Sequence, residues 1–317
     1  MRSNISLFFG IGISSLFVAF SPIYTSQYSI KADLLYWKAN EQGLSYAFVA
    51  NNGSLGDDTV VKNPEFEWDF GFKLGLSYLL PKDRWDCLLR LTHFHTHTDA
   101  LLHAKKDKVL YPIWITESAP QVADQIKMHW RLHLGFVDLL MGKKIKFSSI
   151  SLYPQCGLRY AIARQKFNLE YQGGMFLPGR EDIVRMKNKF AGIGPYGVLG
   201  ICYPFFSCLS LCASGGISAV YGQFYVHEDE DLATGHIKLL DLRNTFNRLA
   251  FIADGSIFLR WQKMWKESKR KLHMQIGWDV VLLFKQNRLI RFFESTPIDN
   301  SGNLGLQGWQ WGIQYFF

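Results

Sequence analysis

The sequence lacks the features that mark helical membrane proteins and the common classes of enzyme. Its longest internal stretch without charged residues, 190–226, is broken by Pro195, Pro204 and several glycines. A membrane-spanning helix needs about 20 consecutive apolar residues. There is no Gly-x-Ser-x-Gly elbow, no His-Glu-x-x-His motif and no Walker loop. We therefore predict that the protein is not an enzyme, binds no cofactor and has no internal helical anchor.

One glycine-rich segment, 192–197, has the spacing of a dinucleotide-binding loop but not its surroundings. Such a loop needs an apolar strand before it, a helix after it and an acid about 20 residues further on. Here Lys187 and Lys189 precede the glycines, and the next acid is Glu228. We interpret the glycines as small positions inside a barrel or as a bend.

The sequence also lacks a tract of basic residues, although its net charge is +8 and its pI is about 9.1. Lysines and arginines are scattered and often adjoin acids, as in segments 180–182 and 266–267. This pattern differs from a nucleic-acid footprint, so we predict no nucleic-acid partner. A basic inner wall of a pore, or basic loops facing anionic lipid phosphates, accounts for the charge at least as well.

The N-terminus has the pattern of a secretory signal peptide. Arg2 is followed by an uncharged stretch at 5–20, then by Ser21-Pro22 and a polar run to Ser29. The apolar part is too short for a confident spanning helix, although an uncleaved anchor is the alternative. We predict a signal peptide at residues 1–26, with cleavage between 21 and 29, followed by a single domain at 27–317.

The end of the chain alternates strictly between large apolar residues and small or polar ones. The apolar parity consists of Trp309, Trp311, Ile313, Tyr315 and Phe317, and the other parity of Gly308, Gln310, Gly312 and Gln314. Since a strand has a period of two, one face is a continuous apolar row. A core strand of a soluble β domain would show this pattern, and so would a membrane β-barrel, whose outer wall faces lipid.

Four further segments alternate in the same way, at 66–80, 150–162, 249–261 and 272–282. Each is about 10 residues or longer, which is enough to cross a bilayer at a tilt, whereas soluble strands average 5–6. We predict an all-β protein, a transmembrane antiparallel β-barrel of roughly 12 strands; the pattern is consistent with any number of strands from 10 to 16. The polar gaps at 51–63, 99–125, 165–189, 227–244 and 286–303 are then the long outer loops.

The parity rule also predicts which side chains line the interior. The pore-lining candidates are Lys31, Asp33, Lys73, Arg131, His133, Arg159, Arg248, Asp254, Arg260, Lys271 and Asp279. Bases outnumber acids in this set, so we predict a mild preference for anions. The prediction depends on parity alone, and one β-bulge would invert a strand.

Histidines and cysteines form the remaining candidate sites. His93, His95 and His97 share one parity and can converge on a transition metal, but polar positions lining the lumen are the favoured interpretation, so we predict no metal. Five cysteines fit no zinc pattern. Cys202, Cys208 and Cys212 lie close in sequence, so disulfides within or between chains and inert thiols are equally favoured.

Several motifs resemble a family of pore-forming outer-membrane proteins, the major outer membrane protein-like proteins of Legionella and chlamydia-related bacteria. The resemblance covers about 28–317 and rests on segments 32–39, 41–47, 70–75, 138–143, 154–159, 190–195 and 304–308. It implies a single barrel pore in the outer membrane of a Gram-negative bacterium. Gln310, Gly312, Tyr315 and Phe317 resemble the C-terminal signal by which such barrels engage the assembly machinery.

We therefore expect a porin-like channel for the passive diffusion of small hydrophilic solutes. The alternative is a structural or adhesive envelope protein, cross-linked by cysteines and with little pore activity. Outer-membrane lipid, lipopolysaccharide and the barrel-assembly machinery are the expected partners. A homo-oligomer is a further candidate because porin trimers are common, although no segment identifies an interface.

Overall fold

The computed structural model describes residues 27–51, 58–80, 85–105, 108–116, 122–174, 181–232, 237–265, 270–293 and 296–317. The predicted signal peptide, 1–26, lies outside these residues. In the described part of the chain, no helix combines the length and apolarity that crossing a membrane would require.

The fold is a closed antiparallel β-barrel, as predicted. Its strands are β1 (Tyr28–Glu41), β4 (Trp68–Leu79), β5 (Trp85–His103), β7 (Gln125–Lys143), β9 (Ile150–Gln172), β10 (Glu181–Pro204), β11 (Leu209–Leu232), β12 (Ile237–Met264), β13 (Lys271–Asn287) and β16 (Gly302–Phe316). They form the order β10-β11-β12-β13-β16-β1-β4-β5-β7-β9, and β9 pairs with β10 to close the ring. The eleventh strand of the sheet, β8 (Ile145–Phe147), pairs only with β9, so ten strands make the barrel.

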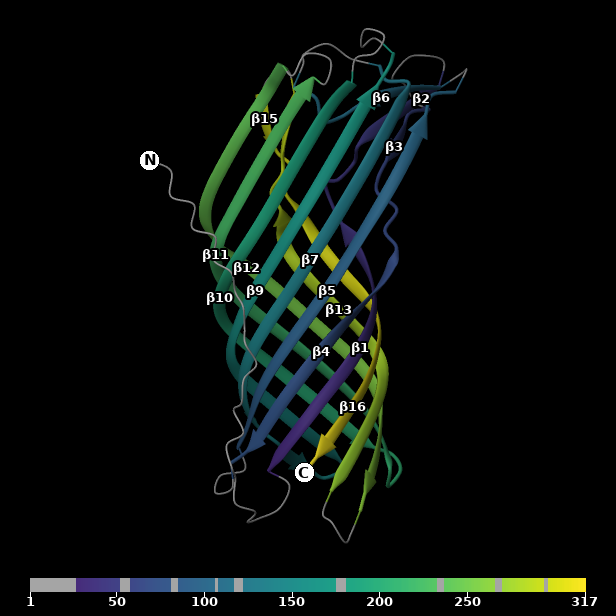
Figure 1. The fold of residues 1–317 in the computed structure, drawn as a ribbon. Coiled ribbons are helices and arrows are strands. Elements are labelled where there is room, and N and C mark those ends of the chain that lie inside the picture. Colours follow the sequence, from purple (N-terminus) through teal and green to yellow (C-terminus); the bar gives the residue numbers. More distant parts are fainter. Residues whose placement is uncertain are drawn as a thin grey trace, which may run out of the picture.

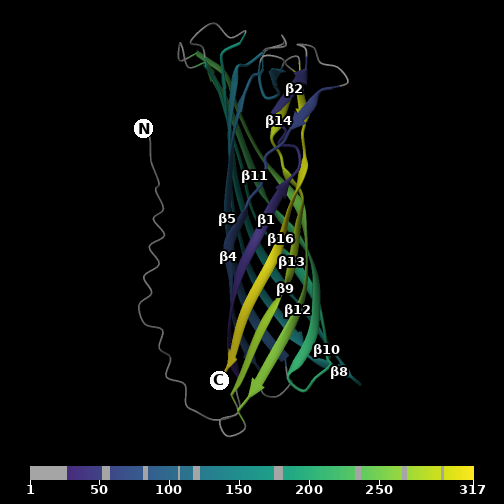
Figure 2. The same ribbon diagram turned by 90° about the vertical axis from the view of Figure 1, so that its right-hand side faces the viewer.

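The barrel has a tall wall and a short wall (Figures 1 and 2). The tall wall consists of β5, β7, β9, β10, β11 and β12, and the short wall of β13, β16, β1 and β4. For example, β12 pairs with β11 along 237–261 but with β13 only along 252–264. Short strands accompany the long connections at the upper end: β2 (Ala47–Asn51), β3 (Val60–Lys62), β6 (Lys108–Pro112), β14 (Ile290–Phe293) and β15 (Thr296–Asp299).

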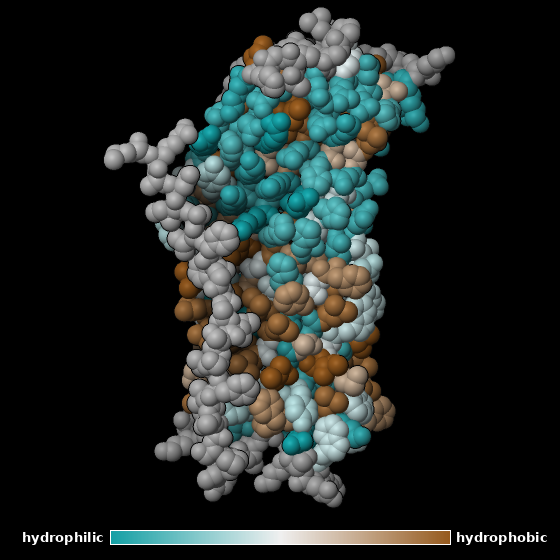
Figure 3. All heavy atoms as spheres, viewed as in Figure 1, coloured by the Kyte–Doolittle hydropathy of each residue, from teal (hydrophilic) through white to brown (hydrophobic). Residues whose placement is uncertain are grey.

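The polarity of the two faces reverses part way up the tall wall. We define the upper half as 93–103 of β5, 125–135 of β7, 163–172 of β9, 181–191 of β10, 223–232 of β11 and 237–248 of β12. In the lower half of β9, Leu158 is 49% exposed on the outside and Arg159 is 3% exposed on the inside. In its upper half, Phe167 is buried inside, whereas Lys166 is exposed outside. Figure 3 shows the same change, from a hydrophobic lower surface to a hydrophilic upper one.

The inside of the upper half is a hydrophobic core. Its fully buried large side chains include Trp37, Phe94, Trp130, Phe167, Tyr171, Phe190 and Phe224. Residues near the short strands β2 and β6 join this core, among them Tyr46, Leu110 and Trp114. The upper half therefore has the polarity of a water-soluble β-protein, because water rather than lipid surrounds it.

The outer connections fall where the polar gaps predicted them, but two of the predicted loops are largely strand. Most of 165–189 belongs to β9 and β10, and most of 227–244 to β11 and β12. The four acids 228–231, which we expected in a solvated loop, lie in β11, and Glu228, Asp229 and Glu230 are buried. The two segments resembled loops because polar side chains alternate with apolar ones in strands that water surrounds.

Candidate functional site in the barrel interior

The interior of the lower half holds a buried ion cluster on the tall wall. This Arg159 cluster consists of Arg90 on β5, Asp138 on β7, Arg159 on β9, Tyr196 on β10 and Asp254 on β12. Asp138, which is 0% exposed, accepts hydrogen bonds from Arg159 Nε at 2.7 Å and Arg90 Nη2 at 2.7 Å. Arg159 Nη1 donates to Asp254 at 2.8 Å, and the hydroxyl of Tyr196 donates to the same carboxylate at 2.6 Å.

The Arg159 cluster spans the interior rather than following the wall. Five strand steps separate β5 from β12, which is half of a ten-strand ring, and side chains of both strands belong to one hydrogen-bonded network. The Arg159 guanidinium lies 3.6 Å from the ring centre of Tyr196 and 4.8 Å from that of Phe136. Bidentate arginine–carboxylate pairs with cation–π contacts hold their geometry well. The network therefore crosses the lumen at this level.

A second group of paired charges lies on the short wall. Lys73 Nζ is 2.6 Å from Asp279 and 5.0 Å from the ring centre of Trp37. Asp33 accepts a hydrogen bond from Gln275 at 3.1 Å and pairs with Lys31 at 3.1 Å. In the two groups together, the bases Lys31, Lys73, Arg90 and Arg159 pair with the acids Asp33, Asp279, Asp138 and Asp254. The inner wall thus carries balanced charge at these positions.

Above the ion pairs, the apolar core closes the upper half. The connections at the upper end are hydrogen-bonded to residues of this core. Trp114 Nε1 donates to the carbonyl of Ser45 at 2.6 Å, and the Tyr171 hydroxyl donates to the carbonyl of Tyr46 at 3.4 Å. Glu228 is buried in this half and accepts a hydrogen bond from the Ile290 backbone N–H at 2.5 Å. Burial raises the pKa of the Glu228 carboxyl to about 8, so this acid is protonated near neutral pH.

Most of the pore-lining candidates face the interior. Those on the inner face and at least partly buried are Lys31, Asp33, Lys73, Arg159, Asp254, Arg260 and Asp279. Arg248 has the inward parity of Ala250 but is exposed, because β12 has no β13 partner at that height. Lys271 is exposed at the first residue of β13.

For Arg131 and His133, the prediction was wrong: both are exposed on the outer face of β7. The apolar parity there, which includes Trp130 and Leu132, is the buried core face of the upper half. Parity separated the two faces correctly, but we assigned the apolar face to lipid. Arg90 and Asp138 were missed because apolar residues occupy both parities around them, and only the strand register brings them together.

The three histidines of β5 also face outward, so the expected position in the lumen was wrong. The rings of His95 and His97 lie 6.2 Å apart, and the ring of His133 lies 4.2 Å from that of His95. Within the described residues, no group of three or more histidine, cysteine or acidic side chains is placed to hold a metal ion.

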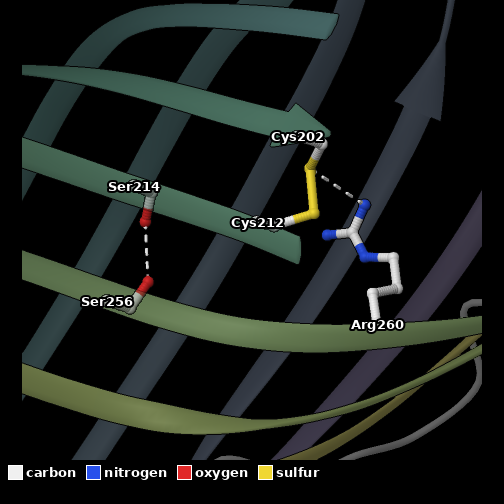
Figure 4. Close-up of a disulfide and its surroundings, with 5 residues drawn as sticks. All are labelled: Cys202, Cys212, Ser214, Ser256 and Arg260. Atoms are coloured by element: carbon white, nitrogen blue, oxygen red, sulfur yellow. Dashed lines mark hydrogen bonds between the residues drawn. A yellow bond between two sulfur atoms is a disulfide. The ribbon is translucent and has the colours of Figure 1, made fainter. Parts of the chain in front are cut away.

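Two of the cysteines are joined inside the lower half (Figure 4). Cys202 on β10 and Cys212 on β11 are direct cross-strand partners and form a disulfide, with the guanidinium of Arg260 3.9 Å from the sulfur of Cys202. Cys208 and Cys156 are free and exposed. The bond ties β10 to β11 beside the hydrogen-bonded pair Ser214–Ser256 of β11 and β12.

The C-terminal strand closes the short wall between β13 and β1. Trp309, Ile313 and Phe317 are exposed on its outer face, whereas Gln310 and Gly312 face inward. Phe317 exchanges backbone hydrogen bonds with Tyr28 at 3.0 and 3.4 Å. Gly312 leaves space for Asp33, whose Oδ1 would lie 1.9 Å from a β-carbon at this position. The role of these residues in assembly stays a prediction.

A closed antiparallel barrel with an apolar outer band defines an outer-membrane β-barrel protein. The sequence matches the model of the Legionella pneumophila major outer membrane protein precursor over residues 20–317. The chain therefore belongs to this family of outer-membrane proteins of Gram-negative bacteria. No curated protein matches the sequence.

Solved barrels share the architecture only in outline. The outer membrane protease OmpT from Escherichia coli is 11% identical, with 94% of this chain and 99% of that chain covered and a TM-score of 0.42. A Pseudomonas aeruginosa FadL homologue is 8% identical, with 92% and 90% covered and a TM-score of 0.25. The Ralstonia pickettii toluene transporter TbuX is 9% identical, with 93% and 90% covered and a TM-score of 0.24. At these TM-scores, none of the similarities bears on function.

Proposed function

We propose that the protein is a porin-like channel for small hydrophilic solutes whose lumen is closed in this conformation by the Arg159 cluster and by the apolar core above it. The observation that carries the proposal is the charged inner wall of the lower half. An outer-membrane barrel needs apolar groups only on its outside, and buried ion pairs are weak contributors to stability. Paired charges that meet across a lumen can separate and hydrate, which would turn the cluster into the constriction of a pore.

The paired charges of the inner wall weaken the basis for the anion preference. Arg131 and His133, two of its contributors, lie outside, and most of the inward bases pair with carboxylates; Arg260 leaves a small excess of positive charge. We expect a channel with little selectivity between small anions and cations. Reversal potentials in a salt gradient measure this directly, and a strong preference for either ion would contradict the expectation.

Single-channel recording of the refolded protein tests the proposal. Arg159→Ser removes the central cation of the cluster and should make openings larger or more frequent than in the wild type. Arg164→Ser is the matched control, because it removes the same charge from the exposed outer face of the same strand. Equal conductance of the Arg159 and Arg164 variants would show that the cluster is not the constriction.

A second candidate is a structural or adhesive envelope protein, and the apolar core of the upper half favours it. This core lies above the ion pairs, so a solute that passed the Arg159 cluster would meet packed apolar side chains. Liposome swelling distinguishes the two candidates, since a structural protein admits no sugar even as the Arg159→Ser variant. Cross-linking between chains would have to use cysteines other than the bonded pair, such as Cys208 or Cys156, and would appear as multimers on non-reducing gels.

A further inference from the structure

Basic side chains form a band across the outer face of three neighbouring strands of the tall wall. The basic band consists of Arg131 and His133 on β7, Arg164 and Lys166 on β9, and Lys187 and Lys189 on β10. The register places them in two parallel rows, His133–Arg164–Lys189 and Arg131–Lys166–Lys187. His95 and His97 of β5 extend the two rows by one strand.

The basic band has no acidic partners in the part of the chain that the structure describes. Within the described residues, no carboxylate forms an ion pair with any member of the basic band. Nearer the upper rim, basic side chains have acidic partners: Lys127 pairs with Glu170 at 3.2 Å and Arg185 with Asp231 at 2.6 Å. Like charges directly opposite each other on paired strands destabilise a sheet. The band is thus a local concentration of positive charge that an anion would relieve.

The basic band lies at the upper edge of the apolar outer surface. On the same three strands, the uncharged outward positions Gly135, Ile162 and Ala191 lie next below it. They are followed by Val137, Tyr160 and Ile193, which are 39%, 39% and 55% exposed. On the short wall, Tyr36, Trp68, Trp278 and Trp309 form a chain of ring contacts on the outer face. Aromatic rings of this kind collect at the interface between lipid and water. Both features are therefore of the kind expected at a boundary between lipid and water.

We infer that the basic band binds the phosphate groups of lipopolysaccharide in the outer leaflet. Lysine and arginine bind phosphate oxygens through charge-assisted hydrogen bonds, and paired strands place neighbouring side chains about 5 Å apart, close enough to share one phosphate. The band is continuous across three strands and adjoins the apolar surface, so that the acyl chains of a bound lipid would lie along Tyr160 and Ile193. A soluble anion has no acyl chains, so the adjacent apolar wall would not strengthen its binding.

The test measures binding of the folded full-length protein, in a neutral detergent, to lipopolysaccharide and to the same lipid after removal of its phosphates. The variant Arg164→Gln with Lys166→Gln changes the central strand of the basic band. We expect its affinity for intact lipopolysaccharide to fall about 30-fold, since each base near an anionic lipid surface contributes about fivefold. The wild type should lose more affinity than this when the phosphates are removed, because every base of the band then loses its partner.

The matched control is Lys127→Gln with Arg185→Gln, which removes the same charge from ion-paired positions of the upper half. It should bind intact lipopolysaccharide within about threefold of the wild type, because exposed ion pairs contribute little. Equal affinity of the band variant and the wild type, at unchanged thermal unfolding, would overturn the inference. Full competition by millimolar inorganic phosphate would also overturn it, because the site would then bind a free anion and not a lipid.

Discussion

The two halves of this barrel are built from the same strands but have opposite polarity. In β9, Leu158 faces out and Arg159 faces in, whereas a few residues further up Lys166 faces out and Phe167 faces in. The strand continues without interruption between them. Alternation therefore reports only that two faces differ, and the medium outside decides which face is apolar.

The reversal has a simple physical cause. Lipid removes the penalty for exposing apolar groups and penalises exposed charge, so that the lower half keeps its charges inside and pairs them. Water does the opposite, and the upper half buries its apolar groups as a soluble protein does. The basic band lies at the boundary between the lower half, which faces lipid, and the upper half, which faces water.

The largest expected effect comes from disrupting the core of the upper half. Phe167→Ala removes a fully buried ring and should destabilise this half by about 3–5 kcal/mol. Asn168→Ala, on the outer face one residue further on, should change stability by less than about 0.5 kcal/mol. Hydrogen exchange of the β9 amides measures both changes, and equal protection in the two variants would contradict the assignment of the core.

A charge placed on the lipid face should have the next largest effect. Leu139→Arg, at a side chain 56% exposed on the lower outer surface, should cost about 2–4 kcal/mol if it lies near the bilayer centre. Asn168→Arg places the same charge on the upper outer surface and should cost almost nothing. Urea unfolding from lipid vesicles compares the two, and similar losses would show that lipid does not end where the polarity changes.

Glu228, one of several buried acids in the upper half, should make this half sensitive to pH. The folded state holds the Glu228 proton up to about pH 8, whereas an unfolded chain releases it near its ordinary pKa of 4.5. The unfolded state therefore binds fewer protons between these values, and stability falls as the pH rises through this window. Proteolysis of the upper half should be about tenfold slower at pH 5.5 than at pH 8, an order-of-magnitude expectation. Burial also raises the pKa of Glu41, the partner of Gln165, to about 8. Glu228→Gln should therefore lose part of this dependence, and an unchanged pH profile in that variant would assign the effect to another group.

The smallest effect concerns the free cysteines of the lower half. Cys156 is exposed on the outer face of β9 next to Leu158, so lipid should protect it from a membrane-impermeant maleimide. Cys208 lies in the turn after β10 and should react when the reagent reaches the lower end of the barrel. Rapid labelling of Cys156 in intact membranes would place the apolar band elsewhere.

The sequence was sufficient to predict the barrel, the positions of the outer connections and the outer face of strands such as β16 and β4, because lipid-facing rows are long and strictly alternating. It was insufficient at Arg131 and His133, where the apolar parity of β7 belongs to a core and not to lipid. The same reversal made the upper parts of β10 and β11 resemble loops. The Arg159 cluster could not be predicted, because its members come from five strands whose register depends on the whole ring.

Spin-label accessibility along β9 tests the reversal of polarity most directly. Single cysteines at successive positions from 152 to 170, labelled and reconstituted in lipid, report contact with oxygen from the bilayer and with a water-soluble relaxing agent. We predict oxygen contact at the even positions up to Ile162, water contact at the even positions from Arg164 onward, and neither at Phe167 and Leu169. Oxygen contact that continues to Glu170, or water contact at Phe167, would contradict the account.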